Sequence, residues 1–197
     1  MPRRYEMSTR TAGMERTRES ILDAAVELFG PAWFDEVTLA DVAARAGVSQ
    51  QTVVNHFGSK VGLYLTGISE RFAPTVAEQR GTATPGDVDS IVATVMDDYE
   101  RTGDGTFRNV VLAERIEELA PLIEGGRQAH RAWVEHVFAP QLGRLRGARR
   151  ERTVVLLATA LDVSVWKRLR REQGLGVAAT ADHLRVLVSG VLATVDT

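Results

Sequence analysis

The stretch that decides the fold is residues 38–60, which reads TLADVAARAGVSQQTVVNHFGSK. Thr38 followed by Asp41 is typical of the capping box that begins a helix, and Gly47 suits the left-handed residue that ends one. Ser49 is a good N-cap for a second short helix. Two short helices joined by a tight turn at Gly47 are the sequence form of a helix-turn-helix.

Apolar residues of suitable size fit the inside of this motif. Ala43 lets the two helices approach closely, and Val42 and Val53 can fill the space between them. The opposite side of the second helix then carries Gln50, Gln51, Val54 and Asn55. Glutamine and asparagine can pair bidentately with adenine in the major groove, and valine can contact a thymine methyl group. The second helix is therefore predicted to read DNA.

Charge along the motif agrees with that prediction. No Asp or Glu occurs over residues 42–69, although the chain has 26 acidic residues among 197. Arg45, His56 and Lys60 lie in this acid-free run. A surface that faces phosphates should lack carboxylates, because each would repel the DNA backbone. The formal net charge of the whole chain is −2, so no strong positive field surrounds the protein. We therefore expect a modest affinity for DNA that falls steeply with salt concentration.

Helical periodicity continues on both sides of the motif, and no stretch alternates with period two. Residues 15–30 place apolar side chains on one helical face, whereas residues 1–14, with Arg3, Arg4 and Arg10, are interpreted as a flexible basic arm. Further helices are predicted over residues 60–80, 87–101, 106–119, 121–146, 149–173 and 177–195. The predicted fold is all-α, with a three-helix unit over residues 15–60 and a larger helical bundle over residues 61–197.

The order of short motifs resembles the tetracycline-repressor (TetR) family of bacterial regulators. These motifs are Leu28-Phe29-Gly30, Trp33-Phe34, Thr38-Leu39-Ala40-Asp41-Val42-Ala43, Gly47-Val48-Ser49 and His56-Phe57-Gly58-Ser59-Lys60. The resemblance covers about residues 15–64. It implies a DNA-binding domain over residues 15–60, followed by an effector-binding and dimerisation domain over residues 61–197. The chain is thus interpreted as a homodimeric, ligand-responsive transcriptional repressor that a small-molecule effector releases from its operator.

The resemblance also implies roles for individual residues. Thr38 resembles the cap that contacts phosphate in the family, and Lys60 resembles its phosphate-contacting lysine. The expected DNA contacts are Thr38, Arg45, Ser49, Gln50, Gln51, Thr52, Val54, Asn55, His56 and Lys60. Val54 departs from the family, which usually has an aromatic residue there that touches phosphate. Val61-Gly62 also replaces the usual acidic start of the fourth helix.

The final two helical stretches are apolar on nearly every side. Such helices must be covered all round, and an intermolecular helix bundle is an economical cover. The resemblance implies the same arrangement, a homodimer through residues 149–195. Two-fold symmetry would place two recognition helices about 34–36 Å apart in successive major grooves. The operator is therefore expected to be roughly palindromic.

The middle helices are expected to surround a small-molecule site, because apolar and aromatic walls with a few polar groups suit one. The candidate ligand-binding residues are Met96, Tyr99, Phe107, Ile116, His130, Trp133, Val137 and Trp166. His130 and Trp133 are helical neighbours, so their helix is the first candidate for ligand contact.

No sequence feature indicates an enzyme, a cofactor or a metal site. The chain has no cysteine, and it contains no P-loop, HExxH, GxSxG or strand-linked GxGxxG motif. No signal peptide and no membrane-length apolar run is seen, so we expect a cytoplasmic protein. Two alternatives stay open. One is an all-α ligand-binding protein with a vestigial helix-turn-helix, and the other is a helical enzyme that uses carboxylates such as Asp97 and Glu100.

Overall fold

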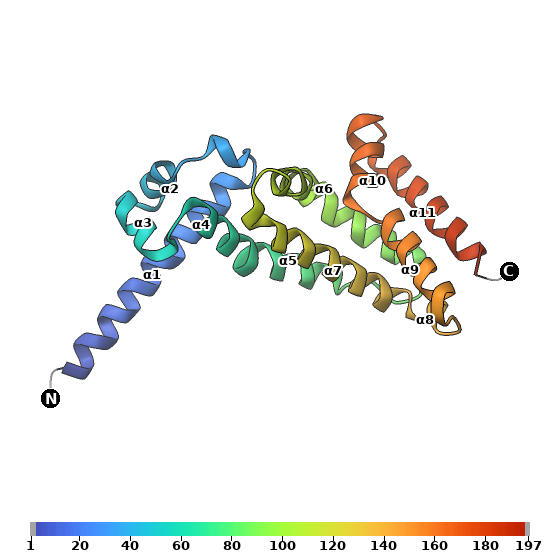
Figure 1. The fold of residues 1–197 in the computed structure, drawn as a ribbon, viewed down its shortest axis with the longest axis horizontal. Helices are drawn as coiled ribbons and strands as arrows, with labels where there is room; N and C mark the ends of the chain where they lie inside the picture. Colours follow the sequence, from blue (N-terminus) through green and yellow to red (C-terminus); the bar gives the residue numbers. More distant parts are fainter. Residues whose placement is uncertain (1–2, 196–197) are drawn as a thin grey trace. The chain divides into compact units, whose positions relative to one another are not determined.

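The computed structural model describes the backbone of residues 3–195 and the side chains of residues 11–195. Helices dominate these residues and no strand occurs among them, which confirms the all-α class (Figure 1). The chain divides into two compact units, residues 1–75 and residues 76–197. We refer to them as unit 1 and unit 2 and describe each by itself.

Unit 1 is built around a helix-turn-helix. Its elements are α1 (Arg3–Phe29), η1 (Phe34–Glu36), α2 (Leu39–Ala46), α3 (Gln50–Phe57), α4 (Lys60–Gly67) and a π-helical turn, η2 (Ile68–Phe72). Helix α1 packs against α2 and α4. Ile21 and Leu22 of α1, Val42 of α2, Val53 of α3 and Leu63 of α4 are fully buried. The core of unit 1 therefore holds α2 and α3 at a fixed angle.

The amino terminus differs from its prediction. Helix α1 begins at Arg3, whereas the sequence predicts a flexible basic arm over residues 1–14. A helix that packing has already nucleated can extend through polar residues at low cost, and Thr17 Oγ1 donates to the Gly13 carbonyl 3.1 Å away in this part of α1. Residues 1 and 2, and the side chains of Arg3, Arg4 and Arg10 in the predicted arm, lie outside the part whose side chains the structure describes.

Unit 2 is a helical bundle. Its elements are α5 (Ala73–Arg80), which begins in unit 1, α6 (Val88–Ala113), η3 (Glu117–Leu119), α7 (Ala120–Val137), α8 (Ala139–Leu142), α9 (Gly147–Ala160), α10 (Val163–Lys167), the π-helical turn η4 (Arg168–Glu172) and α11 (Val177–Ala193). Helix α6 packs against α7, α10 and α11, and α9 packs against α7 and α11. Apolar side chains of these helices form one continuous core.

Several predicted helix boundaries in unit 2 are wrong, and two of the differences have a clear cause. Helix α6 runs straight through Gly103 and Gly105, where the sequence predicts a break. The stretch predicted as one helix over residues 149–173 is interrupted instead at Asp162, whose carboxylate accepts from Ser164 N at 2.8 Å and caps α10. Asp162 lies inside an apolar run of the sequence because it begins a new helix there.

Candidate nucleic-acid interface

The turn between α2 and α3 is fixed by its caps. Thr38 Oγ1 accepts from Asp41 N at 3.1 Å, and Asp41 Oδ2 accepts from Thr38 N at 2.8 Å, which is the predicted capping box. The Thr38 hydroxyl also donates to Asp41 Oδ2 at 2.6 Å, and this bond, together with the one from Thr38 N, holds the pKa of Asp41 below its usual value. Gly47 ends α2 with φ of +69° and Ser49 Oγ accepts from Thr52 N at 3.1 Å to begin α3. The local sequence therefore sets the geometry of the motif.

Helix α3 presents its polar side outward. Val53 is fully buried, whereas Gln50, Gln51 and Asn55 are exposed and Val54 is half-buried. Thr52 and His56 are half-buried on the same helix, and Ser49 and Thr38 are exposed at the helix starts. The residues predicted to read bases thus share the accessible side of α3. Their contact with DNA stays a prediction.

The cationic residues of the motif have partners within unit 1. Lys60 Nζ lies 4.2 Å from the centroid of the Phe34 ring, and partial burial lowers its pKa. Arg45 forms an ion pair with Glu27 of α1, with 2.5 Å between guanidinium and carboxylate. Both side chains remain at least partly accessible. A guanidinium has five N–H donors, so Arg45 can keep Glu27 and still donate to a phosphate.

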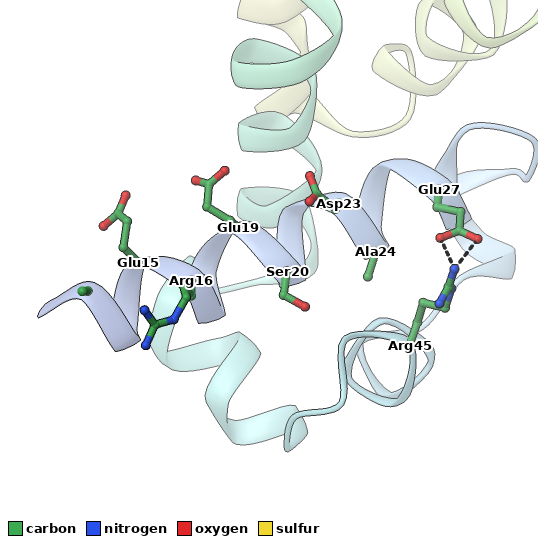
Figure 2. A pocket seen from close by; sticks show the side chains of 9 residues that line it. Glu15, Arg16, Glu19, Ser20, Asp23, Ala24, Glu27 and Arg45 are labelled. Atoms are coloured by element: carbon green, nitrogen blue, oxygen red, sulfur yellow. Dashed lines mark hydrogen bonds and ion pairs between the residues drawn. The ribbon is translucent and has the colours of Figure 1, made fainter. Parts of the chain in front are cut away.

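A groove of about 800 Å³ runs along α1 in unit 1 (Figure 2). It is lined by Ala12, Glu15, Arg16, Glu19, Ser20, Asp23, Ala24, Glu27 and Arg45. Four of these residues are acids spaced four apart, which places them along one side of α1. Such a row opposes phosphate, so of the residues that line this groove only Arg45 belongs to the candidate DNA surface.

The candidate ligand-binding residues lie in unit 2, mostly in its core. Met96, Tyr99, Val137 and Trp166 are buried together, and Phe107 and Trp133 pack against them. Ile116 is half-buried just before η3. Most of these side chains thus serve packing in this structure. Their contact with an effector stays a prediction.

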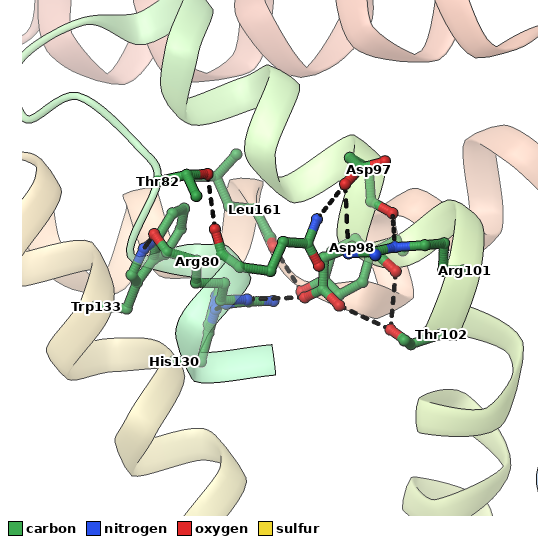
Figure 3. Close-up of polar contacts among 11 residues, drawn as sticks. Arg80, Thr82, Asp97, Asp98, Arg101, Thr102, His130, Trp133 and Leu161 are labelled. Carbon is green, nitrogen blue, oxygen red and sulfur yellow. Dashed lines mark hydrogen bonds and ion pairs between the residues drawn. The ribbon is translucent and has the colours of Figure 1, made fainter. Parts of the chain in front are cut away.

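A buried polar network joins α5, α6 and α7 in unit 2 (Figure 3). Arg80 donates from Nε to Asp98 Oδ2 and from a terminal nitrogen to His130 Nδ1, each at 2.8 Å. Because a guanidinium can only donate, His130 Nδ1 must accept, and the ring is neutral with its proton on Nε2. That Nε2 donates to the Ala158 carbonyl at 3.0 Å. Burial, followed by the charge of Arg80, lowers the His130 pKa.

The carboxylates suggested for a helical enzyme do not share a site. Asp97 bonds to Gln79 and Arg101, whereas Glu100 Oε1 accepts from Trp166 Nε1 at 2.9 Å and from Arg170. Across the described residues, no group of three or more His, Asp or Glu side chains is arranged to hold a metal ion. In the same part of the chain, no helix combines the length and apolar character that a membrane span needs.

A capped helix-turn-helix with amide side chains on the open side of its second helix is the arrangement found in helix-turn-helix DNA-binding proteins. The family model for bacterial regulatory proteins of the tetR family matches residues 21–66. The chain is also 40% identical over 62 residues to the HTH-type transcriptional regulator AlkX of Mycobacterium tuberculosis. Residues 21–66 thus form a domain of the tetR family, the family that the sequence motifs resemble. That match covers 30% of this chain and spans 29% of the length of AlkX.

Solved structures show that the fold extends beyond the matched domain. A tetR-family transcriptional regulator from Streptomyces coelicolor superimposes with a TM-score of 0.70 and 19% identity, over 90% of this chain and 83% of that one. A transcriptional regulator from Rhodococcus sp. Rha1 gives a TM-score of 0.68 with 17% identity, over 92% and 96% of the two chains. At these identities the likeness concerns the fold alone.

Proposed function

We propose that this protein is a homodimeric, ligand-responsive transcriptional repressor that binds a palindromic operator and works in the cytoplasm. The observation that carries the proposal is the accessible side of α3, where Gln50, Gln51 and Asn55 are exposed beside half-buried Val54. No carboxylate occurs in the sequence between Asp41 and Glu70 to oppose phosphate there. The first 60 residues would bind DNA, and residues 61–197 would carry the effector site and the dimer contact.

The DNA-binding step is tested by selecting bound sequences from random duplex DNA with the purified protein at low salt. The expected result is an enriched inverted repeat, because a two-fold dimer presents two copies of α3. Failure to enrich any sequence with a folded protein would favour the alternative in which the helix-turn-helix is vestigial.

The two lysines of the chain give a matched pair of variants. Lys60 begins α4 beside the candidate DNA surface, whereas Lys167 lies on α10 in unit 2, over the Phe107 ring. We expect Lys60→Ala to weaken binding to all DNA sequences and to reduce the slope of log affinity against log salt by about one. Lys167→Ala removes the same charge from unit 2 and should leave that slope unchanged. Equal slopes for the two variants would contradict a phosphate contact by Lys60.

Apolar side chains on α9 and α11 support the proposed dimer. Val155 and Leu156 of α9 are 46% and 41% exposed, and Val186 and Leu187 of α11 are 71% and 44% exposed. A second copy of these two helices would cover them in a four-helix bundle. Val186→Asp should therefore produce monomers in sedimentation equilibrium. Val26→Asp changes an exposed valine of α1 in unit 1 and should leave the dimer intact.

The proposed effector site is in unit 2 along α7. His130 and Trp133 lie on this helix with stacked rings 6.2 Å apart, and the Arg80 guanidinium lies 4.9 Å from the Trp133 ring centroid. Complete switching of a dimer from 99% to 1% competent takes about 5.5 kcal/mol of differential effector affinity. The test is a small-molecule screen for release of labelled operator. A compound that binds unit 2 tightly without changing operator affinity would contradict its role as an effector.

A further inference from the structure

Two amide side chains on the exposed side of α3 are joined to each other. Gln51 Nε2 donates to Asn55 Oδ1 at 3.0 Å, across one turn of the helix. Both residues are exposed, and Val53 between them is fully buried and orients the helix. An i,i+4 contact of this kind is a known stabilising pair on helix surfaces. Here it also constrains how Asn55 faces outward.

The constraint concerns which end of the Asn55 carboxamide carries the oxygen. The oxygen and nitrogen ends of an asparagine amide have nearly the same shape, so an isolated side chain can present either order. A donated N–H from Gln51 requires the oxygen of Asn55 on the side toward Gln51, with the NH₂ group on the other side. One lone pair of Asn55 Oδ1 and both N–H groups of Nδ2 then remain for a DNA base.

We propose that Asn55 reads an adenine in the operator and that Gln51 is the positioning residue that fixes the order of its donor and acceptor. Adenine presents N7 as an acceptor beside the N6 amine as a donor, so it needs one donor and one acceptor from a single amide. Guanine presents two acceptors, which the fixed oxygen of Asn55 would oppose. The inference rests on the proposed DNA-binding function.

Substitutions that remove or reverse the hydrogen bond donated by Gln51 can show whether Gln51 positions Asn55 or contacts a base itself. Gln51→Met keeps a similar volume and charge but removes the donor. Gln51→Glu offers an acceptor instead, which would turn the Asn55 amide over and reverse its donor and acceptor. Neither substitution removes a positive charge, and only the second adds a negative one.

The experiment uses the full-length protein and an operator obtained by selection from random duplex DNA. Each adenine of a half-site is replaced in turn by 7-deazaadenine, which lacks the N7 acceptor, or by guanine in a G·C pair. For the unsubstituted protein, one position should lose about 5- to 150-fold in affinity. The measured ratio is the affinity for the unmodified operator divided by the affinity for the modified one. Asn55→Ala should bring this ratio close to one at a single position, which is then the position that Asn55 reads.

The proposal expects Gln51→Met to lower the same ratio at the same position. The double variant Gln51→Met with Asn55→Ala should then add little to Asn55→Ala alone. Gln128→Met is the matched control. Gln128 lies on α7 of unit 2, where it is exposed and donates to the side chain of Glu124, so that this pair too is four residues apart. It should not alter the ratio.

Three outcomes separate the inference from its premise. If Gln51→Met acts at a different base pair from Asn55→Ala, Gln51 reads its own base and the positioning role is wrong. If Gln51→Met leaves every ratio unchanged, the hydrogen bond has no part in readout and the inference is again wrong. If the unsubstituted protein selects no sequence at all, the proposed function itself fails.

Discussion

Gly103 on α6 lies directly against the indole ring of Trp166 on α10. A Cβ atom added at Gly103 would come within 2.5 Å of Trp166 Cζ3. Trp166 is fully buried, and its Nε1 donates to Glu100 on the same face of α6. The ring therefore cannot move aside without losing both its packing and its hydrogen bond. The absence of a side chain at Gly103 is what allows the two helices to approach.

Gly103→Ala is accordingly expected to destabilise unit 2. Overpacking a filled core costs about 1–3 kcal/mol, which exceeds the roughly 1 kcal/mol that alanine gains over glycine inside a helix. Gly125→Ala on α7 is the control, because nothing lies within 4 Å of the added atom, and it should be neutral or stabilising. Urea denaturation of both variants measures the difference. If both substitutions raised the free energy of unfolding equally, the proposed clash between the methyl group added at Gly103 and Trp166 would be contradicted.

Gly62→Ala should disturb the helix-turn-helix. A Cβ at Gly62 would lie 2.3 Å from the Phe57 carbonyl oxygen, which closes the turn between α3 and α4. Backbone cannot give way as a flexible side chain can, so we expect a loss of at least about 1–3 kcal/mol. Gly67→Ala on the same helix meets Val26 Cγ2 at 3.7 Å, an ordinary contact, and should be tolerated. Amide hydrogen exchange in unit 1 would distinguish the two variants.

Breaking the ion pair between Arg80 and Asp98 is expected to be costly. Their side chains are 11% and 2% exposed, so Arg80→Met leaves a buried carboxylate without its cation. Loss of one partner from a buried pair costs about 3–5 kcal/mol. Arg101→Met breaks an exposed pair with Asp97 on the same helix as Asp98 and should cost less than about 1 kcal/mol. Similar midpoints of thermal unfolding for the two variants would argue against the buried pair.

Stability should fall as the pH decreases below about 6.5 because of His130. Its pKa in the folded state is lower than the ordinary value of 6.5, so the unfolded chain binds a proton more readily. The stabilisation is present above that ordinary value and is lost as the pH falls toward the folded-state pKa. His130→Gln removes the titrating group and should flatten the dependence of stability on pH below about pH 6.5.

The sequence predicts most of unit 1 because its signals are local. Thr38 with Asp41, Gly47 and Ser49 each act within four residues, so the caps of α2 and α3 can be identified without the fold. The exposed side of α3 follows from the buried position of Val53. For this reason the candidate DNA-binding residues are placed as the helical pattern indicates.

Unit 2 is less predictable, because its important contacts join distant residues. Gly103 is interpreted as a helix breaker from the sequence, yet its function depends on Trp166, 63 positions later. The contact between Arg80 and His130 spans 50 positions, and no local pattern indicates it. The bond between Gln51 and Asn55 is also missed, although their spacing of four on a predicted helix could have suggested it.

The end of α9 is held by two donors that respond differently to acid. Tyr99 donates its hydroxyl to the Leu161 carbonyl at 3.0 Å, and burial raises the Tyr99 pKa to about 12, so this donor stays intact at any ordinary pH. His130 keeps its Nε2 proton toward Ala158 in both charge states. Protonation instead removes the acceptor that Arg80 uses. Acid would therefore weaken the contact between α5 and α7, while the end of α9 keeps both of its donors.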